Sequence, residues 1–138
     1  MRRQMFVNLP VKDLDRSVAF FTRLGYTFNP QFTDANATCM VVGTDCFVML
    51  LVEPFFQSFI TTPISDARQA TEVIIAISLD DRAAVDAHVD AALAQGATIA
   101  DEPKDHGFMY DRAYRDLDGH LWEVLCMDMT HPDAPKGA

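Results

Sequence analysis

Long apolar runs, cysteine, glycine and basic residues are all scarce in this chain. Its 138 residues include 3 cysteines, 6 glycines and 7 prolines. No apolar run reaches the roughly 18 residues that a membrane-spanning helix needs. The sequence meets Pro10 after a short apolar run, a start that is not typical of a secretory signal. We therefore expect a cytoplasmic protein with no membrane partner, made of one domain or of two small fused halves.

The cysteines Cys39, Cys46 and Cys126 are odd in number and lack the spacing of a metal-binding motif. We interpret all three as buried thiols in a reducing compartment. We expect no activated thiolate, because no cation is apparent next to them in the sequence.

Basic residues are outnumbered, since 11 Lys and Arg face 20 Asp and Glu and leave a formal net charge of −9. Residues 1–65 carry five of each kind, so the whole imbalance lies in residues 66–138, with six basic and fifteen acidic residues. An acidic chain repels phosphate backbones, so we expect no nucleic-acid partner. Apolar residues at 49 % and charged residues at 22 % are typical of a globular protein.

The first half predicts a strand, a helix and three further strands. The apolar run Gln4–Pro10 is typical of a strand. Asp13 suits a helix N-cap, and Gly25 suits the position after the helix C-terminus. The further strands are expected at residues 26–32, 37–42 and 46–52. Beyond them, Phe55, Phe56 and Phe59 have helical spacing and predict a short helix that covers either the core or a ligand cavity.

The second half repeats this order. A strand is expected at residues 72–79, and then a helix that Asp80 or Asp81 caps and Gly96 ends. Strands follow at residues 97–100, 108–115 and 120–127, with a hairpin turn over residues 116–119. The repeated order predicts a structural duplication, with modules at residues 1–65 and 71–128 and an unstructured tail at residues 129–138.

A strand–helix–strand–strand–strand module forms a curved sheet with a helix on its convex side. Two such modules can roll their concave faces around a common cleft, and alternate residues of each strand then line its inner wall. The predicted fold class is therefore α+β, with two βαβββ modules whose curved mixed sheets surround a central cleft. A cleft of this kind suits a small-molecule ligand.

Two motifs carry a family resemblance. The segment Asn8–Phe21, which reads NLPVKDLDRSVAFF, is followed by Leu24-Gly25, and the segment Asp116–Glu123 reads DLDGHLWE. The chain resembles, over nearly its whole length, the vicinal oxygen chelate superfamily of glyoxalases, extradiol dioxygenases and bleomycin- or fosfomycin-resistance proteins. The second motif is close to the superfamily's terminal Asp-Pro-Asp-Gly-x-x-x-Glu, with Leu117 in place of proline. The resemblance also implies a homodimer.

Enzymes of this superfamily hold a divalent metal with His, Glu or Gln from four strand positions. By resemblance, these positions fall on Phe6, Met49, Ile74 and Glu123. Only Glu123 is a ligand type, because aromatic, thioether and alkyl side chains do not bind a hard divalent ion. A divalent metal cofactor therefore stays open only as a displaced site, in which Glu123 is joined by His106 or Glu72.

Glu123 has two compatible interpretations. Arg112 is expected roughly opposite it across the hairpin, so the two can form an ion pair. Glu123 can also bind metal or ligand, or move protons as a catalytic residue. His106 titrates near neutrality and precedes a strand expected to line the cleft, so it is the second catalytic candidate, unless it only makes local hydrogen bonds in a loop.

The substrate-binding candidates share faces of the expected strands. Tyr110, Arg112 and Tyr114 lie on one face, which is either turned to the ligand or turned to the surface. Asn8 shares the face of Phe6, and a buried amide there needs a neighbour or a ligand as its partner. The complete set is Phe6, Asn8, Met49, Tyr110, Arg112 and Tyr114.

The remaining histidines are not expected in the site. His120 has the opposite parity to Glu123 and is expected to point outward, His88 is expected on the surface, and His131 is expected to be inert in the tail.

Three functions remain open. The first is an enzyme of the lyase, isomerase or dioxygenase type that the resemblance implies. The second is a metal-free protein that binds or sequesters a ligand, as bleomycin-resistance proteins do, and the apolar residues at three metal positions favour it. The third is an interaction domain with a vestigial cleft.

Overall fold

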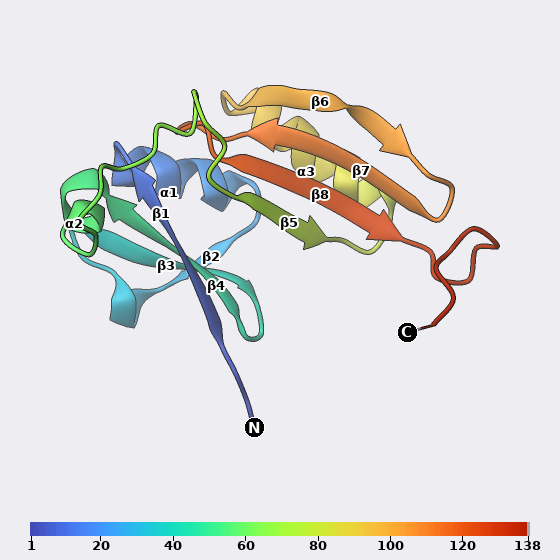
Figure 1. Ribbon diagram of the computed structural model, residues 1–138, viewed down its shortest axis with the longest axis horizontal. Helices are drawn as coiled ribbons and strands as arrows, with labels where there is room; N and C mark the ends of the chain where they lie inside the picture. The colour runs from blue at the N-terminus through green and yellow to red at the C-terminus, as the bar shows by residue number, and fades with distance from the viewer. Residues whose placement is uncertain (138) are drawn as a thin grey trace. The chain divides into compact units, whose positions relative to one another are not determined.

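The computed structural model describes residues 1–137 and divides the chain into two compact units, Met1–Ser65 and a second unit that begins at Asp66. Each unit contains one four-stranded mixed sheet (Figure 1). The strand orders, β1-β4-β3-β2 and β5-β8-β7-β6, are equivalent. The α+β fold class and the repeated order of elements are therefore confirmed.

The elements of the first unit are β1 (Met5–Val11), α1 (Leu14–Arg23), β2 (Thr27–Asn29), the 3-10 helix η1 (Pro30–Phe32), β3 (Ala37–Gly43), β4 (Cys46–Val52) and α2 (Glu53–Gln57). β1 runs parallel to β4, and the other neighbours are antiparallel. The strand expected at residues 26–32 is shorter, because Pro30 begins η1 and its ring has no N–H for a ladder.

Local signals place α1. The carboxylate of Asp13 accepts a hydrogen bond from the backbone N–H of Arg16 at 3.1 Å, as an N-cap does. Gly25 has a φ of 99°, a conformation that glycine adopts without steric cost. α1 lies against β4, and the buried residues alternate along β1, with Leu9 and Val11 each 1 % exposed, whereas residues 37–40 of β3 are all buried. The opposite face of this sheet, its open face, carries Phe6, which is 45 % exposed, and also Leu51, which is buried beside α2.

The elements of the second unit are β5 (Ile74–Ser78), α3 (Arg82–Ala94), β6 (Thr98–Asp105), β7 (Met109–Arg115) and β8 (Leu121–Met127). Asp81 caps α3, since its carboxylate accepts from the N–H of Ala84 at 2.8 Å. α3 lies against β7 and β8 and is seen behind them in Figure 1. Its buried face meets Trp122 and Val124, which are both fully buried.

Two expectations about burial and order are wrong. Cys46 is exposed, because it begins β4 at the end of the hairpin, whereas Cys39 and Cys126 are buried as expected. The tail is not wholly unstructured, because Asp128 accepts hydrogen bonds from the N–H and the hydroxyl of Thr130, and Ala134 is buried. Among the described residues, no helix combines the length and apolarity that crossing a membrane requires.

Candidate functional site

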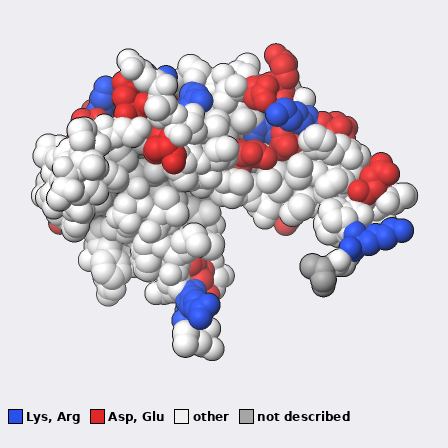
Figure 2. Space-filling model, in the orientation of Figure 1, with Lys and Arg blue, Asp and Glu red and all other residues white. Residues whose placement is uncertain are grey.

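Glu123 lies on the open face of the second sheet, opposite the face that α3 covers. It lines a hollow of about 220 Å³ whose floor is built by β7 and β8. The wall of this β7–β8 hollow consists of Ile74, Ala100, Asp101, Lys104, Asp111, Ala113, Arg115, Leu121 and Glu123. Figure 2 shows acidic and basic side chains together over β6 and β7, whereas the surface over α2 and β3 of the first unit is mainly uncharged.

Lys104 is one of the two cations that line the hollow, and Arg115 is the other. Nζ of Lys104 lies 2.8 Å from a carboxylate oxygen of Asp101. This hydrogen bond raises the pKa of Lys104, and the charges of Asp111 and Glu123 raise it further. Neither Asp111 nor Glu123 has a hydrogen bond or ion pair of its own side chain to any residue that the structure describes.

The expected ion pair between Arg112 and Glu123 is wrong. Ala113 is the residue opposite Glu123, and Arg112 lies opposite Val124. The connection between β7 and β8 contains five residues, 116–120, and not the four that were expected. This difference shifts the register by one residue, and a shift of one residue moves a side chain to the other face of a sheet.

The three residues Tyr110, Arg112 and Tyr114 do share a face, but it is the face that α3 covers. Tyr110 donates its hydroxyl proton to Asp86 at 2.7 Å, and Arg112 donates to Asp86 at 3.2 Å and to Asp90 at 2.9 Å. These residues anchor the helix to the sheet. Within the second unit they are therefore not available as ligand contacts on the open face.

His88 is turned toward the sheet and not toward solvent, which corrects the surface assignment. Its Nε2 lies 3.3 Å from the hydroxyl oxygen of Tyr114, which is fully buried. Burial lowers the pKa of His88 from 6.5 to about 4. The ring is therefore neutral near pH 7 and belongs to the packing of α3.

His106 is exposed in the turn between β6 and β7, where its N–H donates to the carbonyl of Met109 at 2.7 Å. Glu123 is opposite Ala113, four residues further along β7. Four residues of a strand span about 13 Å. The structure therefore does not bring His106 and Glu123 together as a catalytic pair.

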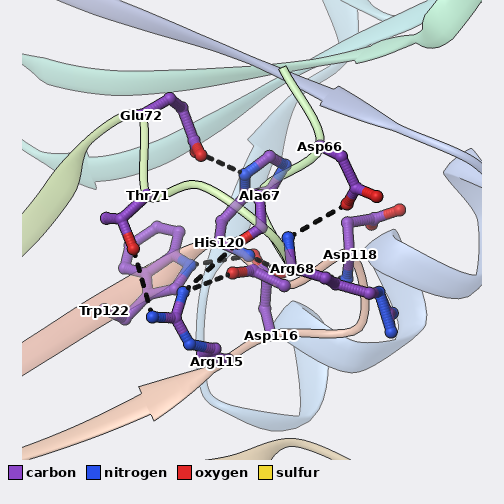
Figure 3. A network of polar contacts seen from close by, with 11 residues as sticks. Asp66, Ala67, Arg68, Thr71, Glu72, Arg115, Asp116, Asp118, His120 and Trp122 are labelled. Atoms are coloured by element: carbon purple, nitrogen blue, oxygen red, sulfur yellow. Dashed lines mark hydrogen bonds and ion pairs between the residues drawn. The ribbon is translucent and has the colours of Figure 1, made fainter. Parts of the chain in front are cut away.

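His120 is the opposite of the outward residue expected, because only 2 % of it is exposed. Its Nδ1 lies 2.8 Å from a carboxylate oxygen of Glu72 (Figure 3). Its backbone N–H donates to Asp116 at 3.0 Å, and the same carboxylate accepts from Nε1 of Trp122 at 2.9 Å. Burial raises the pKa of Asp116. The DLDGH motif is thus the centre of a buried polar network.

The connection between β7 and β8 also contacts residues 66–72, the segment that precedes β5 (Figure 3). Arg68 donates to the carbonyl of Leu117, and Arg115 donates to the hydroxyl of Thr71 at 3.1 Å and to the carbonyl of Gly119 at 3.0 Å. A Cβ on Gly119 would lie 2.7 Å from Cγ of Arg68, so this contact requires glycine. The motif therefore fixes residues 66–72, the start of the second unit, to the connection between β7 and β8.

The open face of the first sheet is apolar. Phe6 stacks on Phe47 with ring centroids 4.9 Å apart, yet 45 % of Phe6 is exposed. Asn8 pairs with Met49 in the ladder and donates from Nδ2 to the carbonyl of Phe6 at 3.2 Å. This hydrogen bond joins the amide to local backbone two residues away.

The short helix α2 lies against β1 and β4 and forms the α2 pocket with them. This pocket is about 340 Å³ and is lined by Asn8, Leu51, Phe56, Phe59 and Ile60. Phe59 packs edge-on against Phe55 and remains 67 % exposed. Of the two roles left open for the phenylalanines, core and cavity, the structure supports a cavity wall for Phe56 and Phe59.

The residues at the four family positions do not fit a divalent metal. Phe6, Met49 and Ile74 offer no oxygen or nitrogen ligand, and Glu72 is hydrogen-bonded to His120. Glu72 precedes β5 and is level with Gly119, so it lies about four residues, or ~13 Å, from Glu123 along the sheet. Within residues 1–137, no three His, Cys, Asp or Glu side chains are grouped closely enough to hold an ion.

Sequence reasoning missed Asp101, Lys104, Asp111 and Arg115 as neighbours of Glu123. A prediction of five residues for the β7–β8 connection would have placed Ala113 opposite Glu123. Asp111 and Arg115 lie on the same face of β7 as Ala113, so this prediction would have identified both of them. Asp101 and Lys104 carried no such signal, since the register between β6 and β7 is irregular on both sides of Asp101.

The chain is similar to known proteins in part of its sequence and in its fold. A family model described as bleomycin resistance protein-like N-terminal matches residues 3–43. None of the curated proteins matches the chain. A hypothetical protein from S. aureus is 28 % identical, with a TM-score of 0.77 over 91 % of this chain and 95 % of that one.

Two further structures share the fold. A glyoxalase/bleomycin resistance protein/dioxygenase family enzyme from Burkholderia phytofirmans is 16 % identical, with a TM-score of 0.76 over 92 % of this chain and 100 % of that one. A fosfomycin resistance protein from Mesorhizobium loti is 15 % identical, with a TM-score of 0.68 over 94 % and 96 %. The chain therefore has the glyoxalase/bleomycin resistance/dioxygenase fold, and its residues 3–43 are similar to the bleomycin resistance protein-like N-terminal family.

Proposed function

We propose that the protein binds a small organic molecule with an apolar, aromatic body and holds it without a protein-bound metal. The observation that carries this proposal is the chemistry of the open faces. Three of the four positions that hold metal in related enzymes are Phe6, Met49 and Ile74, and these side chains present apolar surface in place of ligand atoms. Exposed apolar surface of this kind is typical of a binding site.

The α2 pocket supports the aromatic character of the ligand. Phe56 and Phe59 can pack against a planar ring, and such ring pairs favour offset or edge-on geometry. Asn8 adds an amide at the wall of the same pocket. An amide can orient a hydroxyl or carbonyl group of the ligand.

An enzyme of the lyase, isomerase or dioxygenase type is less well supported. In the superfamily, such chemistry uses a metal that binds two neighbouring oxygens of the substrate. The donor set here supplies one carboxylate at the family positions, Glu123, and the distant His106 does not complete a pair with it.

The first test measures binding of 2-naphthol, a neutral planar probe, by fluorescence titration. Phe59→Ala should weaken binding about tenfold, because it removes an aromatic wall of the α2 pocket. Phe32→Ala is the matched control, since Phe32 is also exposed, at 57 %, and lies in η1 outside the pocket. Equal affinities of the two variants would contradict the proposed pocket.

The second test measures metal in protein purified without chelator. We expect no stoichiometric metal and no change of melting temperature on addition of a chelator. One metal ion per chain that is lost in Glu123→Ala would overturn the proposal and favour the enzyme.

A further inference from the structure

We propose that the β7–β8 hollow binds an organic monocation, a primary ammonium or guanidinium group, between Asp111 and Glu123. The inference goes beyond the proposed function, because this hollow lies in the second unit and the α2 pocket lies in the first.

The two carboxylates are diagonal neighbours on the open face. Glu123 is opposite Ala113 and Asp111 is opposite Leu125, so the two acids lie two residues apart across the ladder. Diagonal neighbours in a sheet are separated by about 7–8 Å. The small side chain of Ala113 lies across from Glu123 and leaves space between the acids. One cationic group with several N–H donors can therefore reach both carboxylates.

Asp111 is the second and independent observation, beyond the gathering of acids. It is only 8 % exposed and lines the hollow, yet no hydrogen bond or ion pair is found for its side chain in the part of the chain that the structure describes. Among the described residues, its carboxylate oxygens are not fully enclosed, and Lys104, opposite Asp111 in the ladder, attracts them without a hydrogen bond. A ligand that carries positive charge and enters the hollow can donate the hydrogen bonds that these oxygens do not receive from the chain.

Among the described residues, neither cation of the hollow donates a hydrogen bond to Asp111 or Glu123. Lys104 forms its ion pair with Asp101, and Arg115 donates to carbonyl groups and to the hydroxyl of Thr71. Asp101, Asp111 and Glu123 carry three negative charges, and Lys104 and Arg115 carry two positive ones. The hollow is therefore left with one negative charge, which a single monocation neutralises.

A divalent metal fits this place less well than an organic cation. Metal ions of this class need several oxygen ligands in close geometry. No group of three acidic, cysteine or histidine side chains is close enough to provide them among residues 1–137.

The test is an NMR titration of the ¹⁵N-labelled full chain with n-butylammonium at low ionic strength. Its neutral counterpart n-butanol has the same alkyl body without the charge. We expect n-butylammonium to shift the amides of β7 and β8 around Asp111 and Glu123 in a saturable manner. The isosteric variants Asp111→Asn and Glu123→Gln should each weaken binding about tenfold, because each removes one charged acceptor.

Glu102→Gln is the control, because it removes the same charge as the other variants. Glu102 is exposed on β6 and does not line the hollow. It should change the affinity less than twofold. The proposal is overturned if Glu102→Gln weakens binding as much as the other variants, if n-butanol shifts the same amides equally, or if Ca²⁺ or Mg²⁺ alone binds there more tightly. If Asp111→Asn does not fold, the titration of Glu123→Gln alone tests the proposal.

The two proposals fail separately. If 2-naphthol binds and n-butylammonium does not, the monocation inference is wrong and the proposed function stands. If n-butylammonium binds while 2-naphthol does not, the aromatic ligand body is wrong and the charged site stands.

Discussion

Nδ1 of His120 lies 2.8 Å from a carboxylate oxygen of Glu72, and this contact joins the residue after the terminal Asp-Leu-Asp-Gly motif to the segment before β5. His120 is almost fully buried, so the contact lies inside the packed structure. The motif that carries the family resemblance therefore has a structural role in this chain, because it holds the segment before β5 in place. Within the longer segment Asp116–Glu123, Leu121 and Glu123 line the β7–β8 hollow.

The first prediction concerns Gly119. Gly119→Ala should lower the free energy of unfolding by about 3 kcal/mol, because φ is +88° and the new Cβ meets Arg68. Gly25→Ala is the control, since its φ is +99° and nothing lies within 4 Å of the new Cβ. It should cost only about 1 kcal/mol of backbone strain. Urea unfolding measures both, and equal losses would show that the contact with Arg68 is unimportant.

The second prediction concerns the pair Glu72 and His120. A double-mutant cycle with Glu72→Ala and His120→Ala should give a coupling energy of about 1 kcal/mol, because each single variant breaks the same hydrogen bond. A second cycle that combines Glu72→Ala with His88→Ala should give a coupling near zero, since His88 contacts Tyr114 instead. Comparable values in the two cycles would contradict a specific pair.

The third prediction concerns pH. The folded pKa of His88 is about 4, below its value of 6.5 outside the fold. As pH falls from 6.5 toward 4, the unfolded chain takes up a proton that the folded chain does not, so stability is lost. His88→Gln should therefore lose less stability than the parent between pH 7 and pH 4.5. An NMR titration in which the His88 ring protonates near pH 6.5 would contradict the buried assignment.

The fourth prediction separates the two faces of the second sheet. Arg112→Ala should lower the free energy of unfolding by about 2 kcal/mol, because it leaves Asp86 and Asp90 of α3 without their shared partner. Glu123→Ala should change it by less than about 0.5 kcal/mol, because its carboxylate has no such partner. Thermal and urea unfolding distinguish these outcomes, and the reverse order of effects would mean that the faces are assigned wrongly.

Capping and turn residues in the sequence correctly predicted where several helices and strands begin and end. The caps at Asp13 and Asp81, the glycines Gly25 and Gly96 and the turn that begins at Asp116 were all predicted, because each depends on a few neighbouring residues. The candidate site was harder. Tyr110, Arg112 and Tyr114 were correctly placed together, but on an undecided face, and His120 was placed outside although it is buried.

The sequence by itself determined the order of the elements, their ends and the duplication, since hydrophobic period, caps and turn residues act over short stretches of chain. Only the tertiary structure decided which face of β7 α3 covers and where the hairpin register lies. The alternation of side chains along a strand shows which residues share a face of the sheet. It does not show which of the two faces is buried. The packing of α3 against Trp122 and Val124 settles that choice, and it leaves Glu123 on the open side.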